Sequence, residues 1–251
     1  MKNTDMEIVY GKNAIREVLS SGREVFKVFA VDDLREFIDD ARKRRIECVT
    51  MNSKKFGQVV RDKYGVSGNH QGILALVAPY EYVPLQQLLN QVASKEEPGF
   101  IVILDGLEDV HNLGAILRTA DAAGVHGIII PKHRSVGLNT TVARLSTGAI
   151  EYVPVAQVTN LVRAIEDLKK SGFWVVGTDA SEAQDYREVD YKGSTALVIG
   201  SEGQGMGRLV RDTCDFKVYL PMKGRISSLN ASVAAALLMY EVCNQRYPIL
   251  Q

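Results

Sequence analysis

Short apolar runs alternate with helix-like stretches along most of the chain, and this alternation most limits how it can fold. Six runs of strand length occupy the second half of the sequence: 100–104, 128–130, 152–155, 174–177, 196–199 and 217–220. Helical stretches lie between most of these runs: 112–123, 140–145, 160–170 and 207–212. Strands that alternate with helices form a parallel sheet covered by helices. Residues 100–251 are therefore predicted to form an open parallel α/β domain that a long helix closes.

The first half follows a similar pattern on a smaller scale. Strands are predicted at 7–10, 25–30, 47–51 and 73–77, with helices between them, around a mostly parallel or mixed sheet. Between 79 and 99 the composition changes, because three prolines bracket a Gln-rich segment that holds one short helix at most. The sequence thus predicts a small α/β domain at 1–80, a linker at 81–99 and the larger domain at 100–251.

Composition excludes several classes of protein. With 251 residues, 46% hydrophobic residues and a formal net charge of zero, the chain is neither disordered nor a general polyanion binder. No apolar run approaches the roughly 20 residues that span a bilayer, and the first residues lack a signal-peptide core. The three cysteines are widely spaced, without a Cys-x-x-Cys pair, which indicates neither a metal site nor a disulfide framework. A cytoplasmic protein with no membrane partner is expected.

Basic residues are concentrated in the first domain. Residues 1–80 contain 14 Lys and Arg against 11 Asp and Glu, whereas residues 81–251 contain 16 against 19. The densest basic cluster is Arg42, Lys43, Arg44 and Arg45. Such a run is typical of a solvated helix face, but it can also contact the phosphates of a nucleic acid. These four residues are therefore the candidates for nucleic-acid binding.

Polar side chains follow three strands of the larger domain, and in open parallel sheets ligands bind beyond the carboxyl ends of the strands. After strand 100–104 come Asn112 and, six residues later, Arg118, within a helix otherwise rich in Ala, Leu and Ile. Asn112 can be an N-cap. A guanidinium in such a helix needs either a partner or open water, because unpaired burial is costly.

The other two strand ends follow 196–199 and 217–220. Four glycines between Gly200 and Gly207 surround Glu202, and they match neither a Walker loop nor a dinucleotide-binding fingerprint. Such a turn either brings backbone N–H groups close to a ligand or makes a tight connection. The third segment places Ser228 and Asn230 before an Ala-rich helix, where either residue can serve as the N-cap.

Together and in this order, the three segments resemble the motifs of the SpoU (TrmH-like) RNA 2′-O-methyltransferases of the SPOUT superfamily. The motif positions are matched, in chain order, by Asn112, Arg118, Glu202, Ser228 and Asn230. The stretches 10–14 and 68–73 resemble the family's substrate-binding domain. The similarity is greatest to the RlmB-type enzymes, which methylate a guanosine ribose in 23S rRNA.

The resemblance implies a fold, a cofactor and an assembly. It implies an L30e-like first domain that binds RNA, a trefoil knot in the larger domain, a homodimer, and S-adenosylmethionine (SAM) as methyl donor. By matching position, the cofactor would contact Thr178, Gly200, Leu220, Met222 and Leu229. The implied function is 2′-O-methylation in rRNA processing. A tRNA substrate is the alternative within the enzyme class, and a non-catalytic RNA-binding assembly factor is the alternative class.

The resemblance also implies roles at the matching positions. Arg118 would activate the ribose hydroxyl, either as an unusual base or as an electrostatic clamp on the developing alkoxide. The clamp is favoured because arginine stays protonated. Glu202, Ser228 and Asn230 would orient Arg118, the cofactor or the ribose, with Asn112 as the remaining catalytic-motif residue. His111 is a conventional base by chemistry, but its position is typical of a surface histidine.

Overall fold

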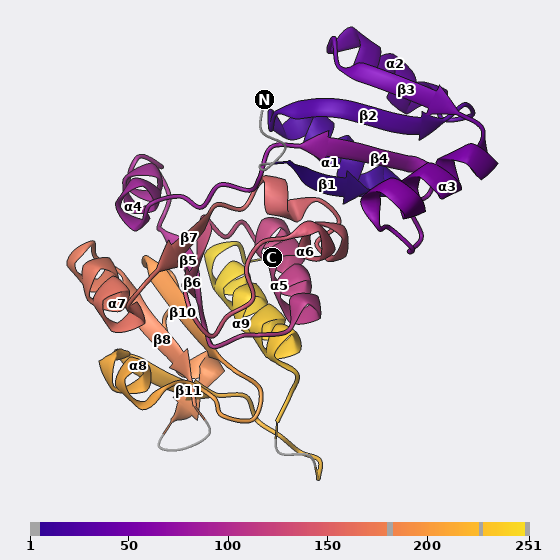
Figure 1. The fold of residues 1–251 in the computed structure, drawn as a ribbon. Coiled ribbons are helices and arrows are strands. Elements are labelled where there is room, and N and C mark those ends of the chain that lie inside the picture. The colour runs from indigo at the N-terminus through magenta and orange to yellow at the C-terminus, as the bar shows by residue number, and fades with distance from the viewer. Residues whose placement is uncertain (1–5, 180–182, 226–227, 249–251) are drawn as a thin grey trace. The chain divides into compact units, whose positions relative to one another are not determined.

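The computed structural model describes residues 6–179, 183–225 and 228–248. The chain forms two compact units, each with its own sheet (Figure 1). Unit 1 runs through Glu81 and also includes Leu138–Tyr152. Unit 2 contains Tyr82–Gly137 and the chain from Val153 onward.

Unit 1 is built on a four-stranded mixed sheet. Its first elements are β1 (Glu7–Tyr10), α1 (Lys12–Ser21), β2 (Val25–Val31), α2 (Arg35–Lys43), β3 (Glu47–Met51), α3 (Ser53–Tyr64) and β4 (Ile73–Val77). The strand order is β1-β4-β2-β3, in which only β2 and β3 pair in parallel. Helix α6 (Thr140–Leu145) and the short 3-10 helix η1 (Ala149–Glu151) complete the unit. All four strands predicted for the first domain are confirmed.

Hydrophobic spacing explains the helices of unit 1. In α1, Ile15, Val18 and Leu19 recur at helical spacing and are at most 3% exposed, so one face of this helix packs on the sheet. In α3, Phe56 and Val60 are buried in a separate cluster with residues of β2 and β4. Both faces of the sheet are therefore covered.

Unit 2 is built on a seven-stranded parallel sheet. Its elements in chain order are α4 (Leu85–Ala93), β5 (Phe100–Asp105), α5 (Val110–Ala122), β6 (Gly127–Pro131), β7 (Val155–Val158), α7 (Leu161–Lys170), β8 (Trp174–Thr178), β9 (Gln184–Asp185), the 3-10 helix η2 (Tyr186–Glu188), β10 (Thr195–Gly200), α8 (Arg208–Thr213), β11 (Phe216–Tyr219) and α9 (Ala231–Arg246). The strand order is β7-β6-β5-β10-β8-β11-β9, and every pair is parallel. The predicted open parallel sheet is confirmed.

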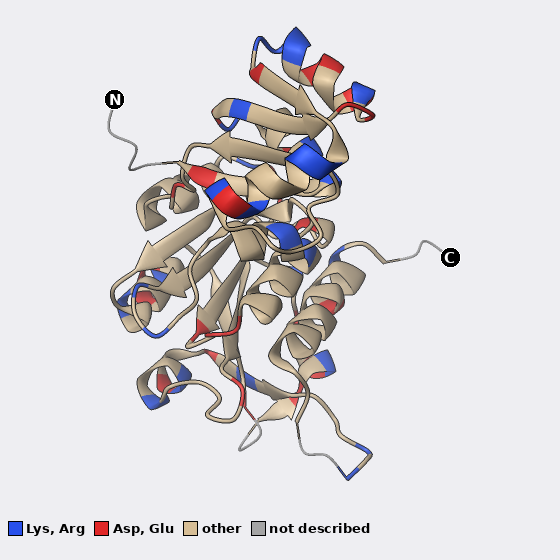
Figure 2. Cartoon of the chain, turned by 45° about the vertical axis from the view of Figure 1, so that its right-hand side comes forward, with Lys and Arg blue, Asp and Glu red and all other residues tan. Residues whose placement is uncertain are grey.

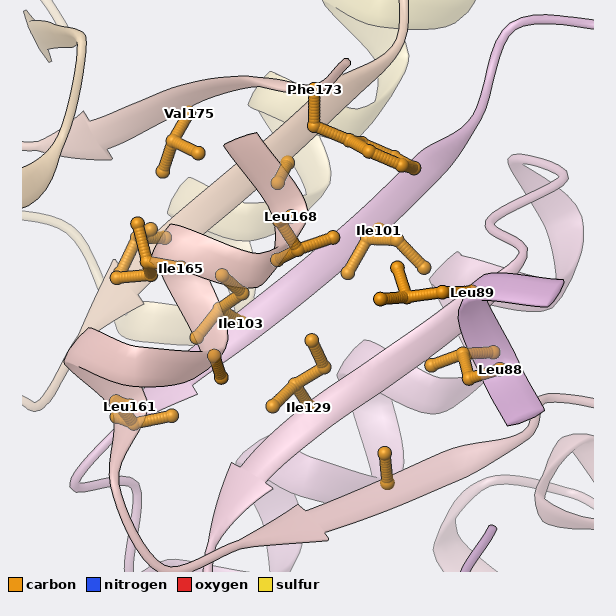
Figure 3. Packing of buried hydrophobic residues seen from close by; sticks show 14 of the residues in the cluster. Leu88, Leu89, Ile101, Ile103, Ile129, Leu161, Ile165, Leu168, Phe173 and Val175 are labelled. Atoms are coloured by element: carbon orange, nitrogen blue, oxygen red, sulfur yellow. The ribbon is translucent and has the colours of Figure 1, made fainter. Parts of the chain in front are cut away.

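Helices cover both faces of this sheet. Helices α4, α7 and α8 lie on one face, whereas α5 and α9 pack against each other on the other (Figure 1). Figure 3 shows leucines of α4 and α7 directed onto Ile101, Ile103 and Ile129 of the central strands. Because side chains alternate along a strand, every second residue of β5 contributes to each face, which requires the unbroken apolar run 100–104.

One predicted strand is displaced along the sequence. The apolar run 152–155 predicts a strand, but β7 begins at Val155 and ends at Val158. Residues 149–151 form η1, and Tyr152 ends this turn with its N–H bonded to the carbonyl of Ala149. Pro154 has no N–H to donate to a sheet, so regular pairing starts only after it. The two-residue strand β9 was not predicted.

The segment expected to be a linker contains a core helix. Helix α4 buries Leu88, Leu89 and Val92 in the main hydrophobic cluster of unit 2. A Cβ at Gly127 would lie 2.5 Å from Leu88, so the strand approaches the helix at a residue without a side chain. Residues from Tyr82 onward therefore belong to unit 2 rather than to a free connection.

The segment Leu138–Tyr152 packs in unit 1, although its sequence lies between two strands of unit 2. Glu151, whose side chain is 3% exposed, forms an ion pair with Arg23 at 3.0 Å and accepts a hydrogen bond from the Tyr80 hydroxyl at 2.9 Å. The Arg23 guanidinium also lies 3.5 Å from the centre of the Tyr80 ring. Desolvation and the adjacent Glu151 carboxylate raise the pKa of Tyr80. This buried network holds the segment to the first sheet.

Candidate cofactor pocket and catalytic cluster

The polar loops of unit 2 meet at one edge of its sheet. Strands β5 and β10 are paired along their length and end together at Asp105 and Gly200. From β5 the chain moves outward to β6 and β7, and then crosses to β8 on the far side of β10. The crevice at such a reversal of direction is where open α/β sheets bind ligands. The carboxyl ends of β5 and β10 therefore mark the candidate site.

A cavity of about 830 Å³ lies at this edge. Its volume falls within the range of roughly 300–1,000 Å³ that small-molecule sites occupy. All five residues predicted to contact the cofactor line it: Thr178, Gly200, Leu220, Met222 and Leu229. Three of the motif residues, Glu202, Ser228 and Asn230, also line it. The cavity thus gathers the ends of β8, β10 and β11 with the start of α9.

The glycine-rich turn folds back on itself. Ser201 and Gly205 exchange two backbone hydrogen bonds of 3.0 and 2.9 Å. A Cβ at Gly200 would lie 2.3 Å from the carbonyl carbon of Gly205, and Gly203 and Gly205 have φ of 85° and 67°. Glycine is the residue that accepts such crowding and such angles. The main requirement for glycine here is therefore a tight connection, which presents Glu202 at the cavity wall.

Three motif residues form one hydrogen-bonded group, which we call the carboxamide cluster: Asn112, Glu202 and Asn230. Asn112 Nδ2 donates to Glu202 Oε1 at 3.0 Å, and Asn230 Nδ2 lies 2.9 Å from Asn112 Oδ1 and 2.5 Å from Glu202 Oε1. The Ala231 N–H adds a third donor to Oε1 at 3.2 Å. Within the described part of the chain, Glu202 Oε2 has no hydrogen-bond partner. One carboxylate oxygen is thus fixed by three donors, on a side chain that is otherwise exposed.

The cluster decides between the alternatives that the sequence left open. Helix α5 is capped by Asp109, which accepts the His111 N–H at 2.9 Å, so Asn112 is not a cap. Asn112 is instead 3% exposed and turned toward Glu202. Asn230 has both roles, because its Oδ1 caps α9 by accepting the Ser232 N–H at 3.0 Å while its Nδ2 joins the cluster.

Arg118 lies outside this cluster within one chain. It follows Asn112 by six residues on α5, which at about 100° per residue turns it some 120° away from the Asn112 face. Its side chain is exposed and does not line the cavity. Among the residues that the structure describes, it forms no hydrogen bond or ion pair. Ser228 lines the cavity but caps no helix, and His111 is exposed at the start of α5.

The predicted nucleic-acid residues lie in unit 1, at the carboxyl end of α2 and just beyond it. All four are exposed. Arg42 lies 3.8 Å from Asp39 and Arg44 lies 3.0 Å from Asp40, so two of the four charges are paired with acidic residues of α2. Figure 2 shows blue and red segments interspersed at the end of unit 1 where Figure 1 places α2.

Sequence reasoning missed three charged residues of the site. Asp105 Oδ2 accepts the Gly207 N–H at 2.7 Å and thereby ties β5 to the end of the glycine-rich turn. Asp179 and Arg211 line the cavity and lie 3.7 Å apart. The position of Asp105 could have been recognised from the sequence, because this residue directly follows an apolar run. Arg211 lies in an ordinary polar helix, and nothing in the sequence distinguishes it.

The cavity suits a molecule with an apolar ring and several charges. Leu220, Met222 and Leu229 supply apolar surface, and backbone groups of the glycine-rich turn supply polar contacts. SAM combines an adenine ring with a sulfonium and an amino-acid end, so these residues fit it. Across the described residues, no group of three His, Cys, Asp or Glu side chains is placed to hold a metal ion. No helix in the ranges that the structure describes is long and apolar enough to cross a bilayer.

Two family models match the chain, one for each part of the sequence. Residues 99–240 match the SpoU rRNA methylase family. Residues 8–83 match the RNA 2′-O ribose methyltransferase substrate-binding domain. The two matches together cover most of both units.

Relatives and solved structures agree with these matches. The chain is 52% identical to YacO of Bacillus subtilis (strain 168), named for the TrmH family of tRNA/rRNA methyltransferases, over 97% of each chain. A Staphylococcus aureus (strain MSSA476) protein of the same family name is 49% identical over 96% of this chain and 97% of its own.

Two crystal structures with bound AdoMet have the same fold. The SpoU methyltransferase AviRb from Streptomyces viridochromogenes is 27% identical, with a TM-score of 0.79 over 96% of this chain and 91% of its own. An rRNA methyltransferase from Sinorhizobium meliloti is 25% identical, with a TM-score of 0.80 over 99% and 89%. The chain therefore belongs to the SpoU rRNA methylase family of SAM-dependent RNA methyltransferases.

Proposed function

We propose that the protein methylates the 2′-hydroxyl of a guanosine ribose in 23S rRNA. The observation that carries this proposal is the carboxamide cluster at the wall of a cavity large enough for SAM. Unit 1 supports it, because this part of the chain matches the substrate-binding domain of RNA 2′-O ribose methyltransferases. A tRNA substrate is the second candidate, because the names of the bacterial relatives cover both RNA classes. In both cases the RNA would be met in the cytoplasm.

The proposed reaction is a direct displacement. SAM, when bound, supplies a methyl group on a positively charged sulfur. A ribose oxygen would bond to that carbon as the carbon–sulfur bond breaks, the electron pair of that bond would stay on sulfur to give S-adenosylhomocysteine, and the hydroxyl proton would pass to water. Glu202 Oε2, held in place through Oε1, would accept a hydrogen bond from this hydroxyl and orient it. Holding the two reacting atoms in line accounts for a large part of the rate enhancement in such reactions.

Arg118 would act as an electrostatic clamp. A guanidinium remains charged at neutral pH, so it stabilises the negative charge that grows on the ribose oxygen. Ser228 and Asn230 would then position the cofactor or the ribose. Because the exposed Arg118 does not line the cavity of its own chain, this role requires that another surface bring it to a cavity.

A homodimer would provide that surface. On α9, Val233, Leu237 and Tyr240 recur at helical spacing and are 47%, 44% and 54% exposed, an apolar stripe opposite the buried face of the helix. Helix α5, which carries Arg118, packs beside α9. We therefore propose that two copies associate through α9 and that Arg118 serves the cavity of the partner subunit.

Subunit complementation tests this arrangement. Arg118→Ala and Asn230→Ala should each abolish most methyl transfer, with losses of about 10²–10³ for the arginine. A mixed dimer contains one Arg118→Ala subunit and one Asn230→Ala subunit. If Arg118 acts across the interface, such a dimer keeps one intact site, and random mixing of the two variants should restore about a quarter of the wild-type activity. If Arg118 acts within its own chain, every site of the mixed dimer is damaged and no activity returns.

The substrate is tested in cells that lack the protein. Mapping ribose methylation across 23S rRNA and tRNA should reveal one lost guanosine methylation in 23S rRNA. Loss confined to tRNA would favour the second candidate. Unchanged methylation in both would favour a non-catalytic assembly factor.

We also propose that unit 1 binds the RNA, with Arg42, Lys43, Arg44 and Arg45 among its contacts. Unit 2 is further proposed to contain a trefoil knot.

A further inference from the structure

One charged pair in the cavity wall does not belong to the carboxamide cluster. Arg211 of α8 and Asp179, which directly follows β8, both line the cavity. Arg211 Nε lies 3.7 Å from Asp179 Oδ2 and 3.5 Å from Asp212 Oδ1. Asp179 is 14% exposed in its side chain and Arg211 is 38% exposed. The pair is thus partly buried and faces the space that a ligand would fill.

The orientation of Arg211 leaves its terminal nitrogens available. The contact printed for each carboxylate is to Nε, and across the residues that the structure describes the two Nη atoms form no hydrogen bond. A guanidinium held at one corner still presents a planar pair of N–H groups. This geometry suits a carboxylate, which accepts two parallel hydrogen bonds from arginine.

Charge complementarity indicates which part of the ligand lies here. The charged residues described in the cavity lining are two carboxylates, Asp179 and Glu202, and one cation, Arg211. SAM carries the opposite set, namely a sulfonium, an α-ammonium and one α-carboxylate. Glu202 belongs to the carboxamide cluster, where the methyl group is transferred in the proposed mechanism. Asp179 and Arg211 are the other two charged residues of the described lining, and their charges complement the two charges of the amino-acid end.

We propose that Arg211 binds the α-carboxylate of the methionine part of SAM and that Asp179 binds its α-ammonium group. This inference rests on the proposed function, because it assumes that the cavity holds SAM. It assigns to α8 a role in recognising the cofactor, and it predicts that the enzyme distinguishes ligands by their amino-acid end. Arg211 is a binding residue in this proposal and takes no part in methyl transfer.

Two thioethers, in which the sulfur carries no charge, can be compared to measure this contact alone. S-adenosylhomocysteine keeps the amino-acid end, whereas 5′-methylthioadenosine lacks both of its charged groups. By titration calorimetry on the full chain, Arg211→Gln should weaken S-adenosylhomocysteine binding about 10- to 100-fold and leave methylthioadenosine within about twofold. Asp179→Asn should show the same selectivity. Arg208→Gln is the matched control, because Arg208 lies on the same helix and pairs with Asp212 but does not line the cavity.

The outcomes separate this proposal from a purely structural ion pair. If Arg211→Gln weakens both ligands equally, or lowers the unfolding temperature without selectivity, Arg211 only supports the fold and the inference is wrong. Unchanged affinity for S-adenosylhomocysteine also overturns it. A wild-type chain that binds neither SAM nor S-adenosylhomocysteine would contradict the proposed function itself, and this inference with it.

Discussion

Asn112 shows how much one residue type can matter at this site. Its carboxamide donates to Glu202 and accepts from Asn230, and it is 3% exposed. Asn112→Asp keeps the shape but places a second carboxylate against Glu202. Two carboxylates in contact repel each other, and the one at position 112 would be buried although Glu202 itself is exposed. The free energy of unfolding should therefore fall by roughly 1–3 kcal/mol at neutral pH, and part of this loss should return as the pH is lowered and the pair takes up a proton.

Urea unfolding of Asn112→Asp and Asn112→Ala across this pH range checks the prediction. The alanine variant loses the hydrogen bonds without adding a charge, so its deficit should vary little with pH. If the two variants follow the same pH dependence, the carboxylate of Glu202 does not face position 112 in solution.

His126 predicts a pH dependence of stability far from the cavity. Its Nδ1 accepts the Phe100 N–H at 2.9 Å, so the ring proton lies on Nε2 and is shared with Glu97 at 2.9 Å. Burial lowers the pKa of His126 despite the Glu97 contact, and Lys95 and Arg246 act in the same direction as burial. The unfolded chain therefore takes up this proton at a higher pH than the folded chain does. The free energy of unfolding should fall as the pH drops below about 6.5.

The variant His126→Asn keeps an acceptor for the Phe100 N–H but cannot titrate. Chemical unfolding at about pH 7.5 and pH 5.5 should show a smaller difference for this variant than for the wild type. An equal difference in both proteins would mean that another group controls stability in this interval.

At the scale of elements, α2 and α3 carry similar numbers of basic residues but different surroundings. Residues 32–47, around α2, contain five Lys and Arg against six Asp and Glu. Residues 52–72, around α3, contain four against one. Lys54, Lys55 and Arg61 form no ion pair with any residue that the structure describes, whereas Arg42 and Arg44 do. The α3 side of unit 1 should therefore attract phosphates more strongly than α2 does.

A matched pair of quadruple variants tests this difference. Replacing Lys54, Lys55, Arg61 and Lys63 by Gln should weaken RNA binding more than replacing Arg42, Lys43, Arg44 and Arg45 by Gln. The slope of log affinity against log salt should become shallower by roughly 0.7–0.9 for each phosphate that the variant no longer neutralises. Equal weakening in the two variants would show that local charge balance does not select the RNA-binding surface.

At the scale of the whole molecule, the limits of unit 2 decide which fragment can fold. The cavity lining lies entirely between Thr178 and Leu238, so a fragment of residues 82–251 should retain SAM binding. A fragment of residues 100–251 lacks α4 and exposes the sheet face that Leu88, Leu89 and Val92 cover. With each buried side chain contributing about 1.5–3 kcal/mol, the shorter fragment should lose roughly 5 kcal/mol of stability.

Thermal unfolding and calorimetry of the two fragments check this prediction. Both fragments contain Leu138–Tyr152 without its partners in unit 1, so they differ only in residues 82–99. Equal stability of the two fragments would contradict the role assigned to α4. If the longer fragment is folded but binds no SAM, the cavity is not the cofactor site.

The sequence by itself determined most strands of the two sheets and the strand ends that carry polar residues. These features depend on local patterns, because a buried parallel strand must be apolar throughout and a tight turn such as Gly200–Gly205 must be rich in glycine. Thr178 and Leu220 were assigned to the cofactor through the resemblance to the SpoU family, and their positions directly after strands agree with that assignment.

Only the tertiary structure decided which side chains act together. Asn112 bonds to Glu202 across 90 positions and to Asn230 across 118, and no local rule distinguishes such a residue from an N-cap. The packing of α4 into unit 2 and the ion pair of Glu151 with Arg23 likewise depend on contacts between distant segments. Hydrogen bonds and burial of this kind exist only once the chain has folded. For this reason the composition of residues 81–99 resembled that of a linker. Helix geometry was likewise needed to separate Arg118 from Asn112.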